Sequence, residues 1–258
     1  MVELILARKG DYPDNFRVLL STGKKKPRVY YAALNASAMA YFGNARLVKA
    51  MHIKKLIHAV SLIPERRFRR ALDLGTGIGI LLPTLSKIAD KVEAIDSSSI
   101  ISYTKYMVKK RKLKNVIVKK FDSNELRNYP QGYFDLIICM STLEHIHDLD
   151  EVFQTFKRLL SKDGIIIIGF PVETKLVVFI HENYMKLFRG QLKEDYDFEK
   201  REVKNPYEKT EGHVSHYQDI IDIAKKYFSI DKKIDLKPFF IKIYFTLKLT
   251  PKKVISDA

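Results

Sequence analysis

The segment Leu72-Asp73-Leu74-Gly75-Thr76-Gly77-Ile78-Gly79-Ile80 constrains the fold of this chain more than any other feature. Its three alternating glycines follow a short apolar run, and they let the backbone turn sharply and approach a ligand that any Cβ would block. The dinucleotide-binding fingerprint requires a glycine at position 80, where this chain has Ile80. The segment therefore predicts a strand, a ligand-binding loop and a helix, without the dinucleotide pattern.

From residue 71 onward, short apolar runs alternate with amphipathic stretches, which is typical of units that build a parallel sheet. We predict strands over residues 71–74, 92–95, 116–118, 134–140, 165–170, 230–236 and 239–249. We predict helices over residues 81–88, 150–160, 177–187 and 220–227, a turn at 161–164, and a helix capped by Ser97, Ser98 or Ser99 that ends near residue 112. The predicted fold class is α/β: a doubly wound, mostly parallel, seven-stranded Rossmann-like sheet.

Two regions lie outside these repeating units. Residues 1–66 form a basic N-terminal extension with one or two helices inside residues 30–62, and we expect it to pack on the core as a lid. Residues 67–258 form the α/β domain, with an insertion at about residues 171–217 after the fifth strand. Cys139, the only cysteine, lies in an apolar run and is predicted to be a core residue, since it cannot form an internal disulfide.

Acidic residues end three consecutive predicted strands. Asp73 precedes the first glycine, where it can fix the loop or accept from a ligand ammonium group. Asp96 ends the second strand, where a carboxylate can accept from both hydroxyls of a ribose; capping the next helix is its alternative role. Asp122, followed by Ser123, ends the third strand, and an ordinary turn aspartate is the alternative there.

The ordered set of these residues resembles the first motifs of the class I S-adenosylmethionine-dependent methyltransferases, in which an acid-x-Gly-x-Gly-x-Gly loop is followed by acids at the next strand ends. The resemblance covers residues 70–170 and implies S-adenosylmethionine as cofactor, with Asp122 facing the adenine amino group. The cofactor-binding residues that it implies are Asp73, Gly75, Thr76, Gly77, Gly79, Asp96, Ser97, Asp122, Ser123 and Met140.

The exit of the fourth strand carries Leu143-Glu144-His145, which resembles the small-molecule branch of the family, that of ubiquinone and menaquinone biosynthesis. The Asn/Asp-Pro-Pro-aromatic motif of enzymes that methylate base amines is absent. Methyl transfer from a sulfonium needs mainly positioning, but an oxygen acceptor must still lose a proton. Histidine suits that task, so His145 and then His213 are the predicted catalytic bases.

Four further residues are predicted to bind substrate: Tyr41, His147, His216 and Tyr217. The segment from Gly212 to Tyr217 resembles a Gly-His-x-x-His-Tyr segment of the same branch. Hydrogen bonds that support the fold are the alternative role for each histidine, and plain core packing is the alternative for Tyr41. The spacing of His213 and His216 suits a metal, but the sequence shows no carboxylate or cysteine partner, so we predict no metal site.

Charge is concentrated in the N-terminal quarter of the chain. The net charge is +16, and residues 1–70 hold 15 basic against 4 acidic side chains, clustered at Lys24–Lys26 with Arg28 and at Arg66–Arg70. Such clusters can neutralise RNA or anionic lipid, although a solvated face explains them equally well. The apolar residues 239–249, flanked by Lys237 and Lys248, are either a lipid-facing edge or, more economically, a buried final strand.

These features predict a cytoplasmic S-adenosylmethionine-dependent methyltransferase that acts on oxygen or carbon of a small or lipid-linked acceptor. No apolar run is long enough to span a membrane, and Met1–Gly10 carries charge where a signal peptide is apolar, although peripheral membrane contact stays open. The alternatives are an RNA methyltransferase that uses the basic N-terminal region and a non-catalytic module that only binds S-adenosylmethionine. The oligomeric state is not predicted.

Overall fold

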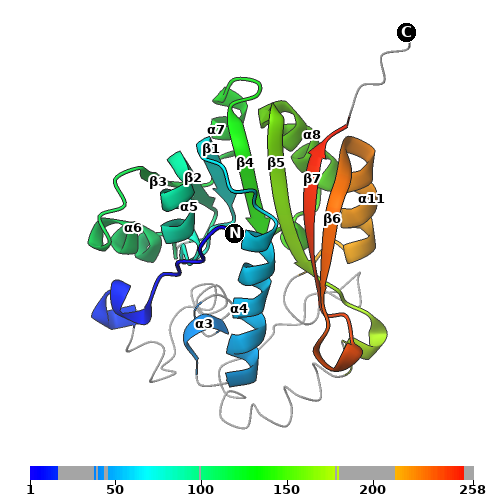
Figure 1. The fold of residues 1–258 in the computed structure, drawn as a ribbon, viewed down its shortest axis with the longest axis horizontal. Coiled ribbons are helices and arrows are strands. Elements are labelled where there is room, and N and C mark those ends of the chain that lie inside the picture. Colours follow the sequence, from blue (N-terminus) through cyan, green and yellow to red (C-terminus); the bar gives the residue numbers. More distant parts are fainter. Residues whose placement is uncertain are drawn as a thin grey trace.

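A computed structural model describes residues 1–16, 38, 40–43, 46–98, 100–177, 179 and 213–252 (Figure 1). They contain one seven-stranded sheet of order β3-β2-β1-β4-β5-β7-β6. Its strands are β1 (Phe68–Leu74), β2 (Ala89–Asp96), β3 (Val116–Lys120), β4 (Phe134–Met140), β5 (Leu160–Pro171), β6 (Phe228–Leu236) and β7 (Tyr244–Pro251). Strands β1 to β5 pair in parallel, while β7 runs antiparallel to both β5 and β6. The mostly parallel sheet that the sequence predicts is confirmed.

Helices cover both faces of the sheet (Figure 1). One face carries α4 (Arg46–Ser61), α5 (Leu82–Ile88) and α6 (Ile101–Lys110), together with the short α3 (Ala40–Phe42) and η1 (Lys9–Asp11). The other face carries α7 (Ser123–Asn128), α8 (Leu149–Leu159) and α11 (Tyr217–Tyr227). The strand order reverses between β1 and β4, and at such a switch point a crevice opens beyond the carboxyl ends of the strands.

Alternating side chains of β5 show why the sequence is apolar along this strand. Ile165 and Ile167 pack with the α4 and α5 side, whereas Ile166 and Ile168 pack with the α8 and α11 side. Cys139 is fully buried in β4 and packs on the α8 and α11 side of the sheet, so the predicted core cysteine is confirmed. Among the described residues no helix is long and apolar enough to cross a bilayer.

Three local predictions are wrong. The serines do not cap α6: its N-cap is Ile100, which makes no side-chain cap bond, and Ser98 instead donates to Asp96. The predicted turn at 161–164 belongs to β5. The last strand begins at Tyr244 rather than at residue 239, because Pro238–Phe240 form a short 3-10 turn, η4, that reverses the chain between β6 and β7.

The N-terminal residues of the chain pack on the core next to the glycine loop. Ala7 N–H donates to the Ile80 carbonyl at 3.1 Å, and the buried Tyr12 hydroxyl donates to the Ile78 carbonyl at 2.9 Å. A role as a lid remains a prediction. Most of the predicted insertion at 171–217, namely residue 178 and residues 180–212, lies outside the described residues, as do Ser99 and the cluster of Lys24–Lys26 with Arg28.

The second basic cluster, Arg66–Arg70, lies at the amino end of β1, which spans about 20 Å. Arg67 bonds Asp90 at 2.5 Å, Arg69 bonds Asp135 at 3.2 Å, Arg66 donates to the Asp163 carbonyl at 2.6 Å, and Arg70 stacks on the Tyr133 ring. These arginines therefore stabilise the amino edge of the sheet, opposite the edge at which parallel strands hold their ligands.

Candidate functional site

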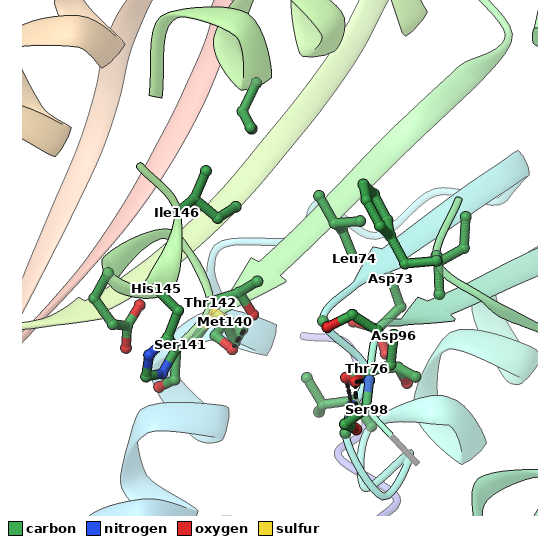
Figure 2. Close-up of a pocket in the computed structure, with 18 of the residues that line it drawn as sticks. Asp73, Leu74, Thr76, Asp96, Ser98, Met140, Ser141, Thr142, His145 and Ile146 are labelled. Atoms are coloured by element: carbon green, nitrogen blue, oxygen red, sulfur yellow. Dashed lines mark hydrogen bonds between the residues drawn. The ribbon is translucent and has the colours of Figure 1, made fainter. Parts of the chain in front are cut away.

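A cavity of about 790 Å³ lies beyond the carboxyl ends of β1, β2, β4 and β5, with α4 on one side. Two groups of its lining residues have labelled members that face each other across the space in Figure 2. We name them the glycine-loop half, made by Asp73–Gly77 and Ile95–Ser98, and the histidine half. The histidine half comprises Tyr41, His52, Lys55, Met140, Ser141, Thr142, Glu144, His145, His213 and Tyr244.

The backbone of the glycine loop requires two of its glycines for different reasons. Gly75 has a left-handed φ of +76°, and a Cβ there would lie 2.0 Å from Thr142 Oγ1, so only glycine lets the loop pass this close to the segment that follows β4. Gly79, also at φ +76°, is not among the described lining residues. A Cβ on Gly79 would lie 2.7 Å from the Thr104 Cγ2 of α6, so this glycine permits close packing of a helix instead of contact with a ligand.

Asp96 connects the end of β2 to the glycine loop. Its Oδ2 accepts from the Gly77 N–H at 2.7 Å, and its Oδ1 accepts from the Ser98 N–H and hydroxyl at 2.8 and 2.5 Å. Asp96, Ser97 and Ser98 all line the cavity, as do Thr76 and Gly77. The carboxylate thus holds two loops together at the place where the sequence predicts a ribose, and it does not cap α6.

Asp73 lies buried at the end of β1, where its Oδ2 accepts from the Thr76 hydroxyl at 2.7 Å. Burial raises the pKa of this carboxyl from 3.8 to about 7, opposed by the Thr76 hydrogen bond and reinforced by the negative charge of Asp96. A cationic group bound nearby would favour the ionised form, so this carboxyl suits a ligand ammonium group.

The end of the cavity near β3 is enclosed by apolar side chains. Phe121 and Leu126 lie there, and Arg127, Ile146 and Glu151 also line the cavity. These five residues were missed from the sequence, because no local pattern marks them as cavity-facing.

Two predicted cofactor residues near β3 are not placed in the cavity. Asp122 is exposed and does not belong to the described lining, and the Ser123 side chain lies outside the described residues. Contact of Asp122 with an adenine therefore remains a prediction.

The two histidines predicted as bases come together in the histidine half, although they are far apart in sequence. Their ring centroids are 4.8 Å apart in an edge-to-face arrangement. His145 ends the 3-10 turn η3 (Leu143–His145) and is exposed to the cavity, whereas His213 is buried. The Val214 and Ser215 N–H groups donate to the Glu144 carbonyl at 2.8 and 3.2 Å, which fixes the two segments to each other.

Carboxylates accompany these histidines, contrary to the prediction from sequence. His213 Nδ1 lies 2.6 Å from Glu173 Oε1. One ligand atom each from Glu144, His145 and His213 lies within 4.8 Å of the others, a donor set that suits a divalent metal ion. The statement that His213 lacks a carboxylate partner is thus wrong, because the fold brings Glu173 from the end of β5 beside it.

Tyr41 lines the cavity as predicted, and α4 contributes two neighbours that the sequence analysis missed. His52 lies edge-on to Tyr41 at 5.6 Å, and burial, followed by the charge of Lys55, lowers its pKa to about 3, so it is neutral at pH 7. Lys55 Nζ lies 4.3 Å above the ring of Tyr244, whose hydroxyl is 2.8 Å from Ser141 Oγ. The spacing of His52 and Lys55 by three residues, which places both on one helix face, is the signal that could have found them.

Three predicted substrate residues, His147, His216 and Tyr217, do not line the cavity within the described part of the chain. His147 is exposed. His216 caps α11 by accepting from the Gln218 N–H at 3.4 Å, and its ring contacts that of Tyr217 at 4.2 Å. The fold-supporting alternative therefore describes His216, and substrate contact by these three residues remains a prediction.

Met140, at the end of β4, lines the cavity within the histidine half (Figure 2). Its terminal methyl and sulfur lie close to the next strand: a Cβ on Gly169 would approach Met140 Cε at 2.4 Å and Sδ at 2.8 Å. The glycine loop, Met140 and the two histidines all line the same cavity.

Comparison with known proteins gives a family. The model of a family described as a methyltransferase domain matches residues 47–225. The chain is 35% identical over 101 residues to the ubiquinone biosynthesis O-methyltransferase of Pelagibacter ubique (strain HTCC1062), which covers 39% of this chain and 41% of that relative. It is 27% identical over 179 residues to the malonyl-acyl-carrier-protein O-methyltransferase of Bacillus cereus, covering 66% of this chain and 59% of that relative. The chain thus spans about half the length of these relatives.

The fold is also found among solved structures. The N-methyltransferase NodS of Bradyrhizobium japonicum WM9, solved in complex with S-adenosyl-L-homocysteine, superposes with a TM-score of 0.58 at 11% identity, covering 88% of this chain and 100% of that one. At this identity the likeness shows the fold alone.

Proposed function

The chain belongs to the methyltransferase domain family, and we propose that it transfers a methyl group from S-adenosylmethionine to oxygen or carbon of a small or lipid-linked acceptor. One observation carries the proposal: a single cavity joins a glycine loop, hydrogen-bonded to Asp96, to a pair of histidines on the opposite wall. The two halves correspond to the two substrates that a methyl transfer needs.

The glycine-loop half fits the cofactor. Backbone at Gly75 and Gly77 is free of Cβ atoms, so a ligand can approach it closely. Asp73 would hold the ammonium group and Asp96 the ribose hydroxyls, while Phe121 and Leu126 would enclose the base. The cofactor supplies a methyl group on a positively charged sulfur.

The histidine half fits an acceptor that must lose a proton. His145 and His213 both reach the cavity, and either can accept a proton from an acceptor hydroxyl. Glu173 orients the His213 ring through its Nδ1. The chain's contribution to the rate is then orientation of the acceptor, exclusion of water and removal of one proton.

The class of acceptor is supported by the relatives. The two curated relatives carry names that specify O-methylation, one in ubiquinone biosynthesis and one on malonyl-acyl-carrier protein. Both names point to acceptors that are lipid-like or attached to a carrier. The wall opposite the glycine loop combines polar groups such as His145 and Ser141 with the aromatic rings of Tyr41 and Tyr244, which suits an acceptor of mixed polarity.

Methylation of RNA finds little support in the described residues. Arg66, Arg67, Arg69 and Arg70 lie at the amino edge of the sheet, away from the cavity, and three of them donate hydrogen bonds to other residues of that edge. A polyanion bound there would not deliver an acceptor to the histidines.

Transfer of labelled methyl from S-adenosylmethionine into an extract separated into small molecules, lipid, RNA and protein tests the proposal. We expect label in the small-molecule or lipid fraction, and loss of that label with His213→Ala. Label confined to RNA would establish the first alternative and contradict our proposal. Absence of label from every fraction, with tight cofactor binding intact, would identify a non-catalytic binding module.

A further inference from the structure

Two neighbouring phenylalanines in the η4 turn are exposed to solvent in a backbone conformation that side chains rarely adopt. Phe239 is 81% exposed and Phe240 is 98% exposed. Their φ angles are +50° and +65°, both left-handed. For a bulky residue this conformation is unfavourable, and two such residues in succession, with no packing in return, indicate that exposure of the rings serves a purpose.

Lysines flank the two rings in sequence and also lie on the adjoining strand. Lys237 and Lys242 flank them in sequence and are exposed, and Lys232 and Lys233 lie on the adjoining β6. The two nearby acids are each held by lysine. Asp235 lies 3.3 to 3.8 Å from the amino groups of Lys233, Lys237 and Lys242, and Asp231 lies 2.6 Å from that of Lys248. The surface is therefore apolar at its tip and positively charged around it.

This turn lies on the same edge of the sheet as the cavity. Tyr244, the first residue of β7, lines the cavity and pairs with Pro171 at the end of β5. The Ile243 N–H donates to the Leu236 carbonyl at 3.0 Å, and its own carbonyl accepts from Val172 at 3.0 Å, which anchors the base of the turn. In Figure 1 the turn projects at the lower right, at the carboxyl edge of β5.

We propose that Phe239 and Phe240, with Lys237 and Lys242, form a docking surface for an anionic lipid bilayer. Aromatic rings insert at the level of the headgroups, and lysines attract anionic lipids. Two rings are too small for a specific protein interface, which buries about 800 Å² on each partner, but apolar insertion and a positive rim are together sufficient for a membrane. The structure contradicts the predicted strand at Phe239 and Phe240, and for these two residues we adopt the lipid-facing alternative as the proposal.

Binding of this surface to a bilayer does not require methyl transfer. Only the delivery of a lipid-linked acceptor to the cavity rests on the proposed function. A lipid-linked acceptor would leave the bilayer next to Tyr244 and enter the histidine half of the cavity. In this proposal the bilayer that the docking surface binds is also the source of the lipid-linked acceptor.

The chain has no tryptophan, so a single introduced indole reports on its own position. Phe240→Trp is compared with Tyr106→Trp, which places the indole at a position 43% exposed on α6, on the side of the molecule away from β7. The probe is vesicles of phosphatidylcholine with roughly one third phosphatidylglycerol, plain or carrying brominated acyl chains. We expect emission of the Phe240→Trp protein to shift to the blue and to be quenched by bromine, and that of Tyr106→Trp to remain unchanged. An unshifted, unquenched Phe240→Trp emission, or equal responses from both proteins, would overturn the proposal.

Sedimentation with the same vesicles distinguishes the contribution of the two rings to vesicle binding from that of the lysine charges. We expect Phe239→Ser/Phe240→Ser to bind at least about tenfold less, and Lys237→Glu/Lys242→Glu about tenfold less at low salt. The matched control Lys105→Glu/Lys109→Glu reverses two exposed charges on α6 and should bind as the wild type does. Wild-type binding by both turn variants would contradict the proposal.

A stability measurement excludes a packing role. Glycine adopts the left-handed conformation without strain, so Phe239→Gly/Phe240→Gly should keep or raise the Tm while losing vesicle binding. A lower Tm together with retained binding would assign the rings to the fold and overturn the proposal. Because S-adenosylhomocysteine binding is measured separately, a protein that binds this nucleoside but no vesicles would refute the docking surface and leave the proposed function standing.

Discussion

The two halves of the cavity are built in different ways. The glycine-loop half comes from two consecutive strand ends, and its geometry is set by backbone: left-handed glycines, a Cβ-free approach and one carboxylate that accepts from a loop N–H. The histidine half is assembled from α4, η3, β7 and residues on both sides of the insertion, and its geometry is set by side chains. The difference predicts that substitutions in the first half change cofactor affinity, whereas substitutions in the second change turnover.

Gly75→Ala should have the largest effect. The new Cβ would meet Thr142 at 2.0 Å and force a left-handed alanine, so affinity for S-adenosylhomocysteine should fall on the order of 100- to 1000-fold. The matched control is Gly132→Ala, which has the same hand of backbone, φ +67°, but no heavy atom nearer than 3.7 Å. Calorimetry measures both. Equal losses of S-adenosylhomocysteine affinity in the two variants would mean that strain of a left-handed alanine lowers the affinity, and not the close approach of residue 75 to Thr142.

His213→Ala should lower kcat by about 100-fold while affinity for S-adenosylhomocysteine changes less than about twofold. The imidazole lies on the acceptor side of the cavity, so its loss removes a proton acceptor without disturbing the glycine loop. His58→Ala, on α4 but outside the described cavity lining, is the control. A fall in cofactor affinity equal to the fall in kcat would remove the distinction between the halves.

Cofactor affinity should rise about tenfold between pH 6 and pH 8, because the Asp73 carboxyl, with its pKa raised by burial to about 7, must ionise to pair with an ammonium group.

The raised pKa of Asp73 affects the stability of the folded chain with the opposite dependence on pH. The folded chain holds this proton more tightly than the unfolded chain, so the contribution is present below about pH 4 and is lost as the pH rises toward 7. Asp73→Asn should flatten both profiles. A pH profile of binding that Asp73→Asn leaves unchanged would assign the titration to another group.

Glu173→Gln should lower kcat by less than about tenfold and move the acidic limb of the pH–rate profile to lower pH. The carboxylate 2.6 Å from His213 Nδ1 favours the protonated imidazole, and a glutamine removes that charge while keeping the volume. Glu173→Asp should restore part of the profile. A fall in kcat without any displacement of the profile would make Glu173 a structural residue only.

The same difference explains what the sequence could predict. The loop from Asp73 to Gly79 and the carboxylate of Asp96 were predictable, because glycine spacing and strand ends are local signals that backbone geometry obeys. Neither the contact of His145 with His213 nor that of Glu173 with His213 could be predicted from the sequence, because tertiary packing alone brings these residues together. The three-residue spacing of His52 and Lys55 is a local signal, but it does not show that their helix face meets the cavity.

Local signals also failed in two places. Phe239 and Phe240 read as part of an alternating strand, yet Pro238 and a left-handed turn place them in solvent. Ser98 reads as a helix cap, yet its hydroxyl donates to Asp96, and the helix begins only after Ile100, its N-cap residue. In both cases the residue type suited the predicted element, but a neighbouring residue, Pro238 or Asp96, favours a different local structure.

Binding of S-adenosylhomocysteine to the wild type, Asp96→Ala and Asp90→Ala tests the central claim most directly. Both aspartates lie on β2, but Asp96 ends the strand at the cavity, whereas Asp90 pairs with Arg67 at the opposite end. Calorimetry should show binding by the wild type, at least about tenfold weaker binding by Asp96→Ala, and a change of less than about twofold for Asp90→Ala. Absence of binding by the wild type, or equal affinity of the wild type and Asp96→Ala, would contradict the assignment of the glycine-loop half to the cofactor.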